Sequence, residues 1–447
     1  MRQFIETIRN IWKIEDLRKR IIYTLGILLV YRLGSFITLP GIDPTQLAGL
    51  KQQTAGGVLG LLDMFSGGAF SNASVFALGI MPYISASIVV QLLGIAVPYF
   101  QRLQKEGESG RRKINQITRY LTVFILVLQA PSYLVNLHAQ IPETAFVIRG
   151  AFFTVSSVII LTAGTMFVMW LGERITDRGI GNGISLIIMI GIIARLPFAT
   201  VAEFGARLEQ QGGGLVAFLV EILAMFVVFM MVILLVQGTR RIPVQYAKRI
   251  VGNKQYGGVR QYIPLKVNAA GVMPIIFAQA LMFVPMTIAG FANSEALTGF
   301  ASAFMNFNGL WYNLVFAILI ILFTYFYTAV TINPTQMAED MKRNGGFIPG
   351  VKPGRKTVEF LDTIMSRITL PGSIFLAFVA ILPAFASIAG VSSQFAQFFG
   401  GTSLLILVGV VLDTLQQIES HLLMRHYDGL MKSGRIKGRS GGAVSAI

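Results

Sequence analysis

The chain has 447 residues, of which 54% are hydrophobic and only 13% charged, and its formal net charge is +16. Soluble globular domains carry about 25% charged residues, so the composition excludes a soluble globular fold and indicates a membrane protein whose basic excess suits anionic lipid or nucleic acid. The lack of cysteine excludes disulfides, thiolate chemistry and cysteine-ligated metals.

Ten apolar runs follow one another along the chain, most of them near the length that crosses a hydrocarbon core of about 30 Å. The weakest run, 184–198, is short and ends at Arg195 and Pro197. We expect ten membrane-spanning helices and an all-α fold. The runs are 21–39, 74–93, 120–137, 151–171, 184–198, 215–236, 270–290, 311–331, 369–388 and 402–419.

Basic residues gather in alternate connecting segments, which hold 32 of the 37 Lys and Arg. Because positive charge marks the cytoplasmic side of a membrane protein, both termini are predicted to be cytoplasmic. The charged lead 1–20 is followed by a run too long for a signal peptide, so it reads as the start of an anchored chain. The basic segments are 1–20, 94–119, 172–183, 237–269, 332–368 and 420–447.

Ten spans divide into two groups of five, and an odd group returns the chain on the opposite side, so the second half enters the membrane inverted. The tetrapeptide Gly-x-Met-Pro occurs at 79–82 and again at 271–274, in the second span of each half. Gly/Pro-interrupted spans at matching places indicate inverted repeats with a working site between them, although a chance match of common membrane residues is the alternative. The predicted organisation is a cytoplasmic N-terminus 1–20, a first half 21–201, a second half 215–419 and a basic tail 420–447.

The segment 54–73 is apolar yet rich in Gly, Ser and Asn, and it precedes the second span on the outer side. It is too interrupted to span a membrane and too apolar for a solvated loop. A short helix that enters the protein from outside fits this composition. An interfacial re-entrant segment without a gating role is the alternative.

Ionisable residues inside the predicted spans are few: Arg32, Glu221 and Asp413. Each is costly in a membrane and so invites a functional role, but interfacial anchoring or one structural ion pair is the favoured explanation, and their scarcity argues against an ion-coupled transporter. The glycines of 178–183 lack the strand that a nucleotide-binding turn requires. Neither a phosphate-binding loop nor a metal or hydrolytic grouping is present, so we expect no enzyme activity and no cofactor.

Two long basic connections, 237–269 and 332–368, interleave aromatic, Gly and Pro residues with positive charge. Fewer charges would suffice to set the topology, so these loops are also predicted to dock an anionic partner such as ribosomal RNA or an acidic protein face.

Long motifs in a fixed order resemble the SecY family, the channel subunits of the bacterial Sec protein translocase, over essentially the whole chain. The first is SVFALGIMPYISASIVVQLL at 74–93. The others are KEGESGRRKINQITRY (105–120), GTMFVMWLGERITDRGIGNGIS (164–185), RRIPVQYAKR (240–249), IPLKVNAAGVMP (263–274), GGFIPGVKPGRKT (345–357) and GGTSLLILVGVVLD (400–413).

The resemblance implies ten helices in two inverted halves of five, hinged between spans 5 and 6 around a central pore. It implies an aliphatic pore ring of Ile80, Ile84, Ile188, Ile276 and Ile406. It implies a plug helix over about 59–70, with Leu59, Leu61, Leu62, Met64, Phe65 and Phe70. It implies lateral-gate positions Gln91 and Asn268, with structural hydrogen bonding as an equal alternative. It implies ribosome and motor docking through Arg240, Arg241, Lys248, Arg249, Lys254, Lys352, Arg355 and Lys356.

The function implied is movement of unfolded polypeptides across the cytoplasmic membrane and release of hydrophobic segments into lipid, with energy from a partner. The implied partners are SecE and SecG, the SecA motor, the ribosome, preproteins with their signal sequences, and anionic lipids. One departure is Lys352, where the family usually carries Arg, because Lys keeps the charge but loses the planar fork. A secondary transporter and a scaffold without a pore are the alternatives.

Overall fold

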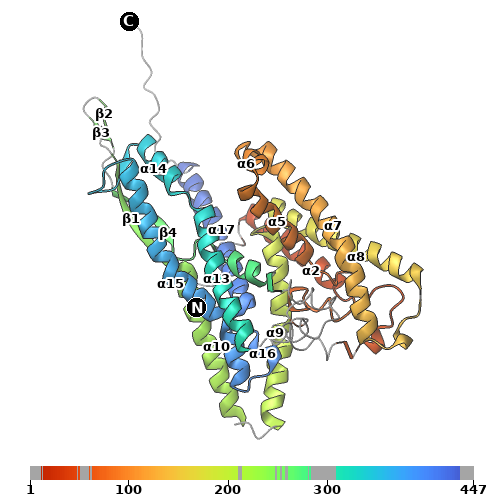
Figure 1. Cartoon of the computed structure of the whole chain (residues 1–447). Helices are drawn as coiled ribbons and strands as arrows, with labels where there is room; N and C mark the ends of the chain where they lie inside the picture. The colour runs from red at the N-terminus through yellow and green to blue at the C-terminus, as the bar shows by residue number, and fades with distance from the viewer. Residues whose placement is uncertain are drawn as a thin grey trace.

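The computed structural model of the chain describes residues 12, 14–47, 49–50, 60, 63–148, 150–209, 214–246, 249–251, 254–256, 260–279, 281–282 and 309–432. It is mostly helical, and Figure 1 shows two groups of long helices with α9 (Gly183–Glu209) between them, whereas α10 (Gly214–Gln237) lies on the side of the C-terminal helices.

The first group follows the expected apolar runs of the N-terminal part. It consists of α2 (Glu15–Gly34), α5 (Met81–Ala96), α6 (Pro98–Lys105), α7 (Glu108–Gln140) and α8 (Ala151–Arg178), with short 3-10 turns η1 (Pro44–Gln46) after α2 and η2 (Glu143–Ala145) after α7. The second group contains α13 (Leu310–Thr331), α14 (Pro334–Arg343), α15 (Arg355–Ile388), α16 (Ser393–Ala396) and α17 (Gly401–Lys432).

Within the described residues, seven helices are long and apolar enough to cross a membrane. The pair α5 and α6, bent by 101°, raises this number to 8. The run 270–290 is described only in part, and α2 carries several charges near its start. The helical membrane fold is confirmed, whereas the division into halves at 21–201 and 215–419 stays a prediction.

Two expected helix boundaries were wrong. The run 184–198 does not end at Arg195 and Pro197, because α9 continues through both to Glu209. Arg195 is compatible with the helix, and its guanidinium pairs with Asp63. The helix of the run 74–93 begins at Met81, since Ser74 forms a β-bridge with Thr38 and residues 75–80 form turns.

The Gly-x-Met-Pro repeat marks the beginning of a helix at both places. Gly79 has φ +55° and Gly271 has φ +64°, a left-handed conformation that favours glycine. The proline then occupies the first turn, where its missing N–H leaves no hydrogen bond unmade: Pro82 in α5, and Pro274 in the helical residues 273–279. The two copies therefore start helices and do not interrupt them.

A small sheet in the two long basic connections was not predicted. Strands β1 (Thr239–Tyr246) and β4 (Arg260–Lys266) pair antiparallel, and β5 (Gly346–Phe347) joins β1 from the other basic loop. Strands β2 (Arg249–Val251) and β3 (Lys254–Tyr256) form a separate hairpin. The two basic loops are thus one structural unit, with a core that includes Ile242, Val244, Leu265, Met341 and Leu361. We call this unit, 239–266 with 334–367, the basic platform.

Candidate functional site

The five isoleucines predicted as a pore ring come together in one apolar cluster. Four of them, Ile84, Ile188, Ile276 and Ile406, line one cavity of about 20 Å³. They reach it from α5, α9, the helical residues 273–279 and α17. Ile80 precedes α5 and is 2% exposed in the same cluster.

The cavity inside this ring is far too small for a polypeptide. A volume of about 10–15 Å³ holds a single water, so about 20 Å³ leaves room for little more. The other lining residues are mostly apolar, with Ser85 and Gln279 as the polar exceptions. The isoleucines therefore enclose a small, mostly apolar cavity, and their role as a pore ring stays a prediction.

The described part of the predicted plug lies next to the ring. Phe65 lines the ring cavity and Met64 packs in the same cluster. Phe70 points elsewhere: its ring lies 4.9 Å from that of Tyr133 on α7, whose hydroxyl donates to the Phe70 carbonyl at 3.1 Å. Leu59, Leu61 and Leu62 lie outside the described residues.

A second cavity of about 310 Å³ borders the same segment and contains two arginines. Arg195 pairs with Asp63, and Nη1 of Arg32 donates to the Gly67 carbonyl. Sequence reasoning identified Arg32 as an intramembrane charge but counted Arg195 among the outer basic residues and did not single out Asp63. No local signal links Asp63 and Arg195, because they are 132 positions apart.

The predicted gate residues do not bond to each other among the contacts of the described residues. Nε2 of Gln91 donates to the Ser87 hydroxyl at 3.2 Å within α5. Asn268 is buried, and its Oδ1 has no hydrogen-bond partner among the described residues. A gate role for both stays a prediction. Sequence reasoning missed a buried bond beside the ring, in which the Thr402 hydroxyl donates to Gln279 Oε1 at 2.7 Å.

Glu221 belongs to a buried charge cluster that joins α9 to α10. Arg207 pairs with Glu221 and, at 3.0 Å, with Glu203, and its Nη2 also donates to the Gly390 carbonyl at 2.8 Å. The other oxygen of Glu203 accepts the backbone N–H of Ser392 at 3.0 Å. These contacts fasten the ends of two helices to the connection before α16 and match the structural ion pair considered for Glu221. Asp413 is exposed on α17.

The predicted docking residues that can be placed lie on the basic platform. Arg240 and Arg241 are exposed on β1. Lys352, Arg355 and Lys356 are exposed around the start of α15, where Arg355 and Lys356 both pair with Glu359.

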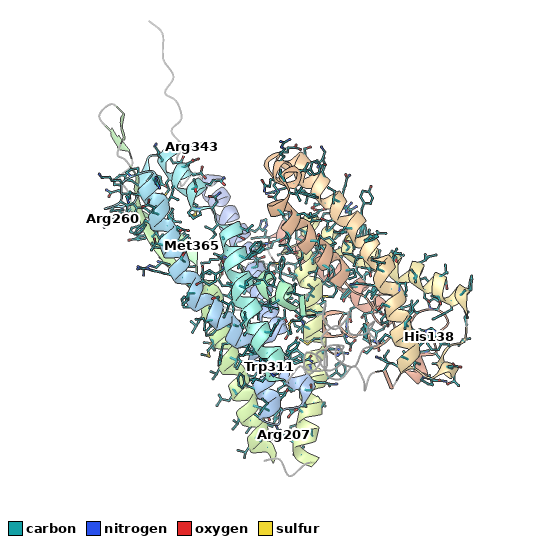
Figure 2. The ribbon with its side chains drawn as sticks, in the orientation of Figure 1. His138, Arg207, Arg260, Trp311, Arg343 and Met365 are labelled. Atoms are coloured by element: carbon teal, nitrogen blue, oxygen red, sulfur yellow. The ribbon has the colours of Figure 1, made fainter. Side chains whose placement is uncertain are left out.

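Arg249 and Lys254 belong to the hairpin β2–β3, and their side chains lie outside the described residues, as does Lys248. Figure 2 shows Arg260 and Arg343 at this end of the molecule and Arg207 at the opposite end. The platform and the buried charge cluster therefore occupy opposite ends. Within the described chain, no group of three or more His, Asp or Glu could hold a metal ion.

Comparisons with known proteins agree with this architecture. The chain is 44% identical over 435 residues to the protein translocase subunit SecY of Streptomyces griseus, covering 94% of this chain and 98% of that protein. It is 44% identical over 448 residues to the SecY of Mycobacterium bovis, covering 96% of this chain and 99% of that protein.

Two solved structures share the fold. One, described as the structure of a protein conducting channel, matches with a TM-score of 0.58 and 20% identity over 90% of this chain and 92% of that one. The channel of a canine ribosome-channel complex from the endoplasmic reticulum matches with a TM-score of 0.54 and 18% identity, over 90% of this chain and 92% of that one. The family model described as SecY matches residues 74–415, and the chain therefore belongs to the SecY family.

Proposed function

We propose that this chain forms the channel through which unfolded polypeptides cross the bacterial cytoplasmic membrane, and from which hydrophobic segments pass sideways into lipid. The observation that carries the proposal is the meeting of four isoleucines, from four separate segments, around one cavity of about 20 Å³. The names of the SecY relatives, protein translocase subunits, support the same role.

An aliphatic constriction suits this task physically. It blocks ions by dewetting, and it presents no fixed charge or hydrogen-bonding group at the isoleucines. A passing chain of any sequence therefore meets side chains that yield by changing rotamer and do not bind it. Because the ring residues sit on separate segments, the constriction can widen when those segments move apart and close again without breaking a helix.

The proposed role is non-catalytic, so the energy comes from a partner. The exposed arginines and lysines of the basic platform offer an anionic partner a surface on the predicted cytoplasmic side. We infer that the SecA motor and the ribosome dock there, that SecE and SecG accompany the chain, and that anionic lipids surround it. The ribosome-bound channel structure that shares this fold supports the ribosome assignment.

Cross-linking tests the pore directly, because the chain has no cysteine of its own. A single Ile188→Cys variant should be captured by a stalled nascent polypeptide that carries a thiol-reactive probe. The matched control is Ile193→Cys on the same helix, where the side chain is 36% exposed and does not line the ring cavity. Equal capture at both positions, or no capture at Ile188→Cys, would contradict the pore assignment.

A further inference from the structure

One face of α9 carries an apolar, a small and a charged residue in succession. Ile188, Gly191 and Arg195 are spaced by three and four positions, so they lie along one side of the helix. The segment 63–73, which overlaps the predicted plug and which we call the seat segment, packs along this side. Its residues come from the outer connection between α2 and α5, far from α9 in the chain.

The seat segment contacts α9 at all three levels of this face. At the first level, Phe65 and Ile188 line the same ring cavity. At the second level the backbones touch, since a Cβ added at Gly67 would lie 2.8 Å from the Gly191 Cα. Gly67 also has φ +66°, which favours glycine. The third level is the ion pair between Asp63 and Arg195.

The ion pair is built into a polar network and is unequally buried. The Asp63 side chain is 0% exposed and that of Arg195 is 27% exposed, because Arg195 borders the cavity of about 310 Å³. Oδ1 of Asp63 accepts the Ser71 N–H at 2.8 Å, and Arg195 Nη2 lies 3.2 Å from the Ser71 hydroxyl. Asp63 therefore depends on this position, whereas Arg195 also reaches the open cavity.

A buried ion pair adds little net stability, but it strongly penalises any arrangement that separates the charges within the protein. Sliding the seat segment along α9 would leave the Asp63 carboxylate buried beside apolar side chains. The same slide would move Phe65, two residues further on, away from the isoleucines. The pair thus selects one position of the segment.

We propose that Asp63 and Arg195 form a positioning pair that sets the register of the seat segment on α9 and so holds Phe65 against the isoleucine ring in the resting channel. The inference rests on the proposed channel function. It assigns to Arg195 and Asp63 a role in keeping the resting channel closed to small ions.

The unequal burial predicts unequal effects of neutral substitutions. Arg195→Gln leaves the fully buried Asp63 carboxylate without its cation. Asp63→Asn keeps an oxygen that accepts the Ser71 N–H and leaves Arg195 beside the cavity. Replacing both residues removes both charges. The double variant can therefore keep the seat segment in place without a buried unpaired charge. Arg195→Lys keeps the charge and should be closer to the unsubstituted chain than Arg195→Gln.

The experiment measures resting ion leak in vesicles that contain the full-length chain purified with its small membrane subunits. Chloride entry is followed with an encapsulated halide-quenched dye, without translocation substrate. We expect Arg195→Gln to raise the leak by at least about tenfold, Asp63→Asn by about threefold, and the double variant to return to within about threefold of the unsubstituted chain.

A leak from Arg195→Gln within about twofold of the unsubstituted chain, or a double variant as leaky as Arg195→Gln, would overturn the inference.

Motor-driven preprotein import into the same vesicles separates this result from the proposed function. Failure of the unsubstituted chain to import would contradict the channel itself, whereas normal import without extra leak in Arg195→Gln contradicts only the positioning pair. If Arg195→Gln yields no folded protein, recovery of folded protein in the double variant tests the same coupling, and no recovery rejects it.

Discussion

Arg207 lies between two buried carboxylates at the connection of α9 to α10 and pairs with both. Its side chain is 15% exposed, and those of Glu203 and Glu221 are 1% and 11% exposed. Arg207→Met keeps most of the side-chain volume but leaves both carboxylates without the guanidinium. Removing one partner of a buried ion pair costs about 3–5 kcal/mol, and we expect a loss of unfolding free energy in this range.

Arg119 supplies a matched control with better hydrogen-bond geometry but greater exposure. It makes two bonds to Glu173, at 2.7 and 3.2 Å, between α7 and α8. The two side chains are 46% and 23% exposed. Exposed ion pairs contribute about 0.2–1 kcal/mol, so Arg119→Met should cost less than a third of what Arg207→Met costs.

Thermal unfolding of the detergent-purified chain, followed by tryptophan fluorescence, measures both effects. At about 2.1 cal/mol/K per residue, a loss of 3–5 kcal/mol lowers the midpoint of a chain of this length by about 3–5 °C. The triple variant Arg207→Met, Glu203→Gln, Glu221→Gln should recover most of this loss, because it removes all three charges of this cluster. Equal destabilisation by Arg119→Met and Arg207→Met would refute the argument that burial governs the cost.

Two other predictions concern the ring and the basic platform. Thr402→Val removes the donor to buried Gln279 Oε1 and should cost about 1–3 kcal/mol in the same unfolding measurement; an unchanged midpoint would mean that Gln279 finds another partner. Reversal of Arg240 and Lys352 to Glu should weaken ribosome binding about tenfold and flatten its salt dependence. Lys113→Glu on α7, away from the platform, should bind normally, and equal losses in both variants would reject a specific docking surface.

The long apolar runs were sufficient to predict most helices, because a membrane helix must satisfy its own backbone within one continuous segment. The runs 120–137, 151–171, 215–236 and 311–331 correspond to α7, α8, α10 and α13. Hydropathy fails where a tertiary contact offsets a local penalty. Arg195 looked like the end of a span because its partner Asp63 could not be seen in the local sequence.

The small sheet was also missed, although its signal is present in the chain. In β1, Ile242 and Val244 are buried and their neighbours are not, which is the period-2 pattern of a strand. The number of positive charges in this loop drew attention to docking and away from that alternation. The pairing of β1 with β5 could not be predicted, because β5 has only two residues and lies about a hundred positions away.

The sheet is connected directly to two of the membrane segments. Only Gly238 separates α10 from β1, and the N–H of Val267, just after β4, donates to the Gly238 carbonyl at 2.8 Å. The chain that leaves β4 reaches the helical residues 273–279, which carry Ile276. A displacement of the sheet would therefore act on two segments at once, α10 and the helical residues 273–279, because both join the sheet where Gly238 and Val267 are hydrogen-bonded. If a partner docks on the basic platform as proposed, its movement would reach the segment of Ile276 without direct contact.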